Sequence, residues 1–222
     1  MILQNKHQEK ALNDLSEAHS AVAGEKYEYQ DLVISLALIE RALADAMRTR
    51  VDLLPLLDET EIEGLDYRLK AHVGRVLALR STMLFDMKEF DFAAHSARLA
   101  VQAYRETLQF HFEDEDRYVA NHLHQLLTRE VTTVAFRPSE VADSYELLFE
   151  YYAEARLLDR AEDMLFHAID LHDHPDHLLE KGLAFYDKLV KMDTRTLQKR
   201  GLPRHEVNES RREILRYINE KS

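Results

Sequence analysis

The sequence predicts an all-α protein in which antiparallel helical hairpins stack side by side. Three observations lead to this fold class. Apolar residues recur at steps of three and four in every long segment, which places them along one face of a helix. Gly and Pro interrupt the chain rarely, with five and four residues among 222. The segments between them are rich in Ala, Leu, Glu and Arg, which favour helix.

The first part of the chain predicts two helices. The first covers Ile2–Ala23 and ends at Gly24. The second, Tyr27–Arg50, has the stronger pattern, with apolar residues at Leu32, Leu36, Ile39, Leu43 and Met47. Pro55 then breaks the segment VDLLPLL, because proline disrupts a helix interior. The acidic stretch DETEIEGL, at 58–65, is expected to form a short helical turn or a loop.

Two further helices are expected next: Tyr67–Met87, with Asp66 as its N-cap, and Glu89–Phe110. The acidic run EDED at 113–116 predicts the start of another helix, because carboxylates are stabilised near the positive end of the helix dipole. The β-branched stretch VTTVAF at 131–136 has no visible partner strand. We therefore interpret it as the frayed end of that helix.

The clearest pair of helices covers residues 138–173 and folds back across Ala155–Leu158. Ser139 is the expected N-cap. The apolar positions of the first helix are Val141, Tyr145, Leu148, Phe149 and Tyr152, and those of the second are Leu158, Ala161, Leu165, Ala168 and Ile169. The small residues Ala161 and Ala168 allow a neighbouring helix to approach closely.

The C-terminal part predicts two more helices. Pro175 is the expected first residue of a helix that ends near Met192. Thr194–Arg200 forms a short turn stopped by Gly201, and Pro203 begins the last helix. No linker rich in Pro, Gly or Ser divides the chain. We therefore predict one domain over 1–222, with N-terminal helices at 1–50, a repeat-like core at 66–192 and a C-terminal helix at 203–220.

The hairpin at 138–173 resembles the tetratricopeptide repeat, which has aromatic, Leu, Gly and Tyr positions on its first helix and Ala, a large apolar residue and Ala on its second. The matching residues are Tyr145, Leu148, Tyr152, Ala161, Leu165 and Ala168, whereas Phe149 occupies the Gly position. A second copy has Leu77, Ser81, Leu84, Ala93, Ala97 and Ala100. Ala93 precedes Ala161 by close to two periods of roughly 34 residues. The degenerate copy between them contains Leu127 and Val131.

The stretches RAEDMLFHAID, EKGLAFYDKLV and GLPRHEV also resemble a family of uncharacterised bacterial proteins with degenerate tetratricopeptide-like helices. The resemblance extends from about Tyr27 to the end of the chain and implies a right-handed superhelix of hairpins. It implies no activity. An irregular helical array is the alternative, because helical pairs share the same period without being repeats.

Composition excludes several classes of function. The formal net charge of −12 argues against nucleic acid, which is bound by basic surfaces. The chain has no Cys, so we expect no disulfide framework and a reducing, cytoplasmic location. The start of the chain does not have the pattern of a signal peptide. No apolar run approaches the roughly 18 residues needed to span a membrane.

Catalytic motifs are also missing from the sequence. The patterns GxGxxG, GxSxG and HExxH and the Walker loop are absent, so we expect neither an enzyme nor a bound cofactor. One metal hypothesis remains open: Asp163, His167, Asp170 and His174 would form one stripe on a continuous helix. The alternative interpretation is a solvated helix end.

We predict a protein- or peptide-binding scaffold, because stacked hairpins form a curved surface suited to an extended partner. The candidate binding residues are Asp143, Glu146, Glu150 and Glu154, which share one face of the helix. Like charges four residues apart repel each other, so a basic partner would relieve the repulsion unless Arg156 or Arg160 does so. Self-association through apolar residues on the end helices, at 2–23 and 203–220, is the alternative, and a metal-dependent protein is a third hypothesis.

Overall fold

The computed structural model describes residues 2–22, 29–110, 116–173 and 175–220. These residues form α-helices and one 3-10 helix and contain no β-strand, which confirms the all-α class. Among them, no helix combines the length and the apolar character needed to cross a membrane. The chain divides into two compact units, Met1–Phe136 and Arg137–Ser222. One continuous domain over 1–222 stays a prediction.

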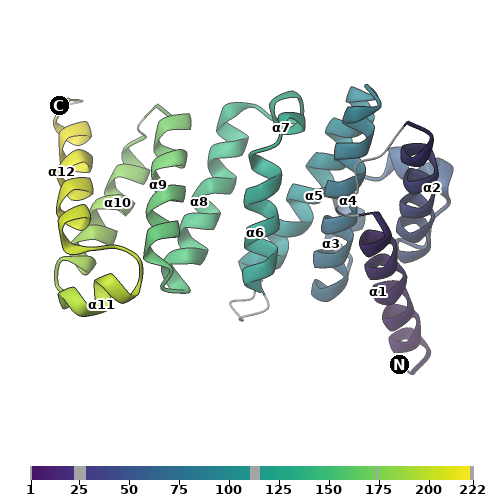
Figure 1. Ribbon diagram of the computed structural model, residues 1–222, viewed down its shortest axis with the longest axis horizontal. Helices are drawn as coiled ribbons and strands as arrows, with labels where there is room; N and C mark the ends of the chain where they lie inside the picture. Colours follow the sequence, from purple (N-terminus) through teal and green to yellow (C-terminus); the bar gives the residue numbers. More distant parts are fainter. Residues whose placement is uncertain (1, 23–28, 111–115, 174, 221–222) are drawn as a thin grey trace. The chain divides into compact units, whose positions relative to one another are not determined.

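Unit 1 contains two antiparallel pairs of sequence-adjacent helices, Ile2–Val22 with Tyr29–Ala46 and Tyr67–Asp86 with Phe90–Phe110, and shorter helices beside them (Figure 1). In chain order its elements are α1 (Ile2–Val22), α2 (Tyr29–Ala46), η1 (Val51–Leu56), α3 (Glu59–Glu63), α4 (Tyr67–Asp86), α5 (Phe90–Phe110), α6 (Asp116–Leu127) and α7 (Glu130–Ala135). The hairpin of α4 and α5 is central to the unit, because α1 and α2 pack against α4 while α6 and α7 pack against α5.

Small residues bring α4 and α5 close together. Ala93, Ala97 and Ala100 on α5 are fully buried, and a Cβ atom at Gly74 on α4 would lie 3.1 Å from Cβ of Ala103. The predicted N-cap of α4 is confirmed, since Asp66 accepts a hydrogen bond from the backbone N–H of Arg68 at 3.0 Å. These contacts confirm the helical pair that the sequence predicted at 67–110.

A buried ion pair joins α2 to α4. Nη2 of Arg80 lies 2.7 Å from Oε1 of Glu40, and Nε of Arg80 donates to the same oxygen at 3.0 Å. Only 4% of the Arg80 side chain and 20% of the Glu40 side chain are exposed. Nη1 of Arg80 donates to Ser96 Oγ on α5. One guanidinium group therefore links three helices.

Several predicted boundaries in unit 1 need correction. The interpretation of 131–136 as a frayed helix end is wrong, because α7 is a separate helix that follows an extended residue, Arg129. The second predicted helix ends at Ala46, since Arg48 has a left-handed φ of 51°. The acidic stretch at 58–65 contains α3, whose N-cap Asp58 accepts from the N–H of Thr60. Gly24 and 113–115 lie outside the described residues.

Unit 2 contains α8 (Pro138–Glu154), α9 (Leu158–Leu171), α10 (Asp176–Leu189), α11 (Thr194–Lys199) and α12 (Arg204–Glu220). The helices α8 and α9 form the predicted hairpin, and α10 packs against α9 and α12 (Figure 1). Ala161, Leu165 and Ala168 on α9 are fully buried. Gly182 allows the close approach of α10, because a Cβ atom there would lie 3.1 Å from Cδ2 of Leu165 and 3.3 Å from Cδ1 of Ile214.

Two helix starts in unit 2 differ from the prediction. Ser139 is not an N-cap: Arg137 has that position, and its backbone N–H donates to Oε2 of Glu140 at 2.8 Å. Proline favours the first helical position and holds the preceding residue extended, so the helix begins at Pro138 and Arg137 is its N-cap. Pro175 is the N-cap of α10, so that helix begins at Asp176.

Candidate functional site

The four carboxylates predicted as a binding face all lie on α8, a regular helix, and their spacing places them along one side of it. Asp143, Glu150 and Glu154 are exposed, whereas only 16% of the Glu146 side chain is accessible. The four carboxylates therefore share one side of α8, but Glu146 is not exposed as expected, and their role in binding stays a prediction.

Residues on α10 bond two members of this stripe, Glu146 and Glu150. Nζ of Lys181 lies 2.5 Å from Oε1 of Glu146 and also bonds Glu150. Nε2 of His177 lies 3.3 Å from Oε2 of Glu146. The repulsion between neighbouring carboxylates is thus relieved within the chain, by Lys181 rather than by the arginines considered from sequence.

The ion pairs change the acidity of both partners. Burial acts to raise the pKa of Glu146, but Lys181 and His177 outweigh it and hold that pKa below its usual value. Burial acts to lower the pKa of Lys181, but Glu146 and Glu150 outweigh it and raise that pKa above its usual value. Both groups are therefore charged at neutral pH, and α8 and α10 are joined by a charged contact along one edge.

Beside this contact, a groove of about 570 Å³ lies between α8, the start of α9, α10 and the end of α11. Its apolar surface comes from Phe149, Ala153, Leu158, Ala184, Phe185, Leu189 and Met192, and its charged surface from Glu150, Glu154, Arg156, Lys181, Lys188 and Arg200. The rings of Phe149 and Phe185 meet edge to face with centroids 5.3 Å apart. This geometry gives the groove an aromatic floor within a charged rim.

The rim of the groove has more cations than anions. Lys181 is bound to Glu150, as described above, which leaves Arg156, Lys188 and Arg200 facing Glu154. Within the described part of the chain, the side chains of these four residues form no ion pair. The net charge of the groove is therefore positive, although the whole chain has a net charge of −12. This feature was not predictable from the sequence, because no local motif brings residues 156, 188 and 200 together.

The candidate metal stripe does not form a metal site in the described structure. Asp163, His167 and Asp170 lie on α9, and His174 lies outside the described residues. The ring of His167 packs against that of Tyr145 with centroids 5.0 Å apart. Across the described residues, no three His, Asp or Glu side chains gather closely enough to hold an ion.

Comparison with known proteins found a match to a protein family. The model of a family described as a family of unknown function (DUF6483) matches residues 81–219. This segment contains every residue that lines the groove of unit 2. No curated protein and no solved structure matched the chain.

Proposed function

We propose that this chain, which belongs to the DUF6483 family of unknown function, is a peptide-binding helical scaffold and not an enzyme. The groove of unit 2 is the observation that supports this proposal most directly. It is open, it has an aromatic floor formed by Phe149 and Phe185, and its rim has unpaired charges. Such a combination suits an extended segment with one apolar side chain and charged neighbours.

The proposal includes a tetratricopeptide-like arrangement, with α4/α5 and α8/α9 as degenerate repeats in a right-handed superhelix. Complete burial of Ala93, Ala161 and Ala168, at the small positions of the repeat pattern, supports it. Phe149 occupies the position at which the repeat prefers Gly. It contacts Phe185 on α10, so an aromatic contact replaces a close helix approach there. In this arrangement the first helix of each pair forms the binding surface.

We propose that the partner segment is acidic. Arg156, Lys188 and Arg200 provide three cations without an ion partner in the described structure, against the single carboxylate of Glu154. A basic segment, expected from the α8 carboxylates alone, would have to displace Lys181 from Glu146 and Glu150. An acidic segment breaks no existing ion pair.

Charge-reversal variants test the polarity of the partner. Two fluorescent peptides of equal length, one with Phe between Glu residues and one with Phe between Lys residues, serve as probes. We expect the acidic peptide to bind more tightly, Lys188→Glu to weaken it at least about tenfold, and added salt to weaken it further. Glu154→Lys should strengthen it.

Arg195→Glu is the matched control, because Arg195 is exposed on α11 and does not line the groove. If the basic peptide bound more tightly and Glu154→Lys weakened it, the α8 carboxylates would be the binding face. If neither peptide bound, the proposal of a peptide groove would fail.

Self-association is a second candidate, favoured by an apolar surface in unit 1. Val33, Ile34 and Leu38 on α2 are 46%, 63% and 52% exposed. By contrast, Val207 and Ile214 on α12 are fully buried, so the surface differs from the end helices named from sequence. Light scattering decides this: a dimer that Leu38→Glu converts to a monomer supports it, and a monomer at high concentration refutes it.

A further inference from the structure

A cavity of about 220 Å³ lies within unit 1, between α1, α4, α5 and α6. Its polar lining consists of two Arg, two His, one Tyr and one Gln: His19, Arg75, Tyr104, His122, Gln125 and Arg129. No carboxylate is among the described residues that line it, although the chain contains 41 Asp and Glu. The cavity is therefore a site of positive charge within an acidic protein.

Three polar atoms in this lining are buried without a hydrogen-bond partner: the hydroxyl of Tyr104, Nε of Arg75 and Nε2 of His122. The Tyr104 side chain is almost inaccessible, with only 1% of the residue exposed. Buried polar groups in folded proteins are nearly always satisfied, by protein, water or ligand. Three unsatisfied groups around one cavity therefore indicate that something polar occupies it.

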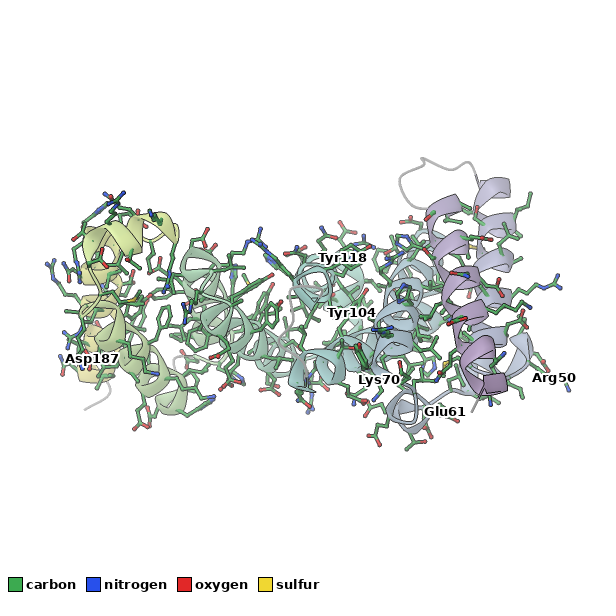
Figure 2. The ribbon with its side chains drawn as sticks, turned by 90° about the horizontal axis from the view of Figure 1, so that it is seen from below. Arg50, Glu61, Lys70, Tyr104, Tyr118 and Asp187 are labelled. Atoms are coloured by element: carbon green, nitrogen blue, oxygen red, sulfur yellow. The ribbon has the colours of Figure 1, made fainter. Side chains whose placement is uncertain are left out.

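Neighbouring aromatic residues hold two of these groups in position. Nη1 of Arg75 donates to the hydroxyl of Tyr118 at 2.6 Å, and the guanidinium lies over the Tyr118 ring, 5.2 Å from its centroid. The edge of the same ring meets His122, with centroids 4.1 Å apart. Figure 2 labels Tyr104 and Tyr118 in this part of unit 1. Tyr118 thus helps to hold Arg75 and His122 in position, which lowers the cost of ordering them when a ligand binds.

The two histidines are neutral at pH 7. Burial and then the charge of Arg75 lower the pKa of His19 to about 4, with a further contribution from His72. Burial and Arg75 also lower the pKa of His122 to about 4, with His19 and Arg129 acting in the same direction. The fixed charge of the cavity at pH 7 comes from the two arginines, and each histidine can add one more on protonation.

We propose that this cavity binds a small tetrahedral oxyanion, such as sulfate, inorganic phosphate or the phosphate group of a larger molecule. Arg75 and Tyr104 are its buried donors, and the more exposed Arg129, whose Nη1 also donates to Oγ1 of Thr82, adds a second positive charge. Donors on three different residues suit a tetrahedral anion, whose oxygens can accept several charge-assisted hydrogen bonds at once. The cavity also exceeds the volume of about 30 Å³ that one water molecule occupies. This site is independent of the proposed peptide groove, which lies in unit 2.

Calorimetric titration with sodium sulfate at pH 6 tests the proposal. Sodium chloride at equal ionic strength is the reference. We expect sulfate to bind, and Tyr104→Phe and Arg129→Gln each to weaken it at least about tenfold, because each removes a donor to a charged ligand. Arg50→Gln is the matched control, since Arg50 is 77% exposed at the side chain and lies outside the cavity. An equal loss in that control would overturn the proposal.

Histidine titration by NMR gives a second, local readout. A bound anion stabilises the protonated ring, so sulfate should raise the pKa of both His19 and His122 and bind more tightly as the pH falls from 7 towards 4. Sulfate keeps its charge over this range, which phosphate does not. Unchanged pKa values with sulfate bound would indicate an adventitious ion only, and no binding beyond chloride would assign water to the cavity. Comparing phosphate with phenyl phosphate then distinguishes a free ion from a phosphate ester.

Discussion

Removal of Glu40 is expected to leave the guanidinium of Arg80 buried without a counter-charge. The residue Glu40 accepts two N–H groups from Arg80, at 2.7 and 3.0 Å. A hydrogen bond to a charged group contributes about 1.5–3 kcal/mol, and breaking a buried pair by removing one partner costs about 3–5 kcal/mol. Because Ser96 still accepts from Arg80, we expect Glu40→Ala to lower the free energy of unfolding by about 3 kcal/mol.

Urea unfolding followed by circular dichroism measures this loss, and hydrogen exchange locates it. Protection should fall in α2, α4 and α5, while α8 and α9 of unit 2 should keep theirs. The double variant Glu40→Leu with Arg80→Met should stay within about 1 kcal/mol of the original protein, because an apolar pair replaces two desolvated charges.

The exposed pair of Lys10 and Asp14, 3.9 Å apart, provides the control. Lys10→Ala should cost at most about 0.5 kcal/mol. A loss below about 1 kcal/mol for Glu40→Ala, or a double variant as unstable as the single one, would refute the reasoning that Arg80 depends on Glu40.

Three further predictions concern unit 2. Gly182→Ala should destabilise it by about 1 kcal/mol in urea unfolding, because crowding against Leu165 outweighs the gain in helix propensity, whereas Gly64→Ala in unit 1 should be neutral or stabilising. Ala161→Leu should cost about 1–3 kcal/mol, since Ala161 is fully buried, and unchanged stability would contradict the hairpin packing. The lowered pKa of Glu146 adds stability that is complete above pH 4.5 and is lost as the pH falls through its folded value. Glu146→Gln should therefore flatten the acid side of the stability curve, and an unchanged curve would contradict the ion pair with Lys181.

The sequence predicted the helices well because their apolar period is a local property. The hairpin at 138–173 and the N-cap at Asp66 were found from neighbouring residues alone. The errors occurred where a local signal has two meanings. Proline can begin a helix, as Pro138 does, or stand just before one, and Pro175 lies one position outside the helix that it was expected to start.

The candidate sites were less predictable, because they depend on packing between helices. The α8 carboxylates were visible as a stripe, but their partner Lys181 belongs to another helix. The cavity of unit 1 combines His19, Arg75, Tyr104 and His122 from four helices. No motif in the sequence joins residues so far apart, and the burial that lowers the histidine pKa values exists only in the folded chain.

The turn between α8 and α9 contains a residue that is unfavourable for the backbone but contributes to the groove. Arg156 has a left-handed backbone with φ of 61°, a conformation that costs a residue with a Cβ roughly 1–2 kcal/mol and glycine almost nothing. Selection for thermal tolerance alone would favour glycine there, as it would at Lys88, which has φ of 66° at the end of α4. Replacing Lys88 would leave the groove intact, whereas replacing Arg156 would remove a cation from its rim. Glycine substitutions at the two positions would thus distinguish the turn at Lys88, which contributes only to stability, from the turn at Arg156, which also contributes a charge to the groove.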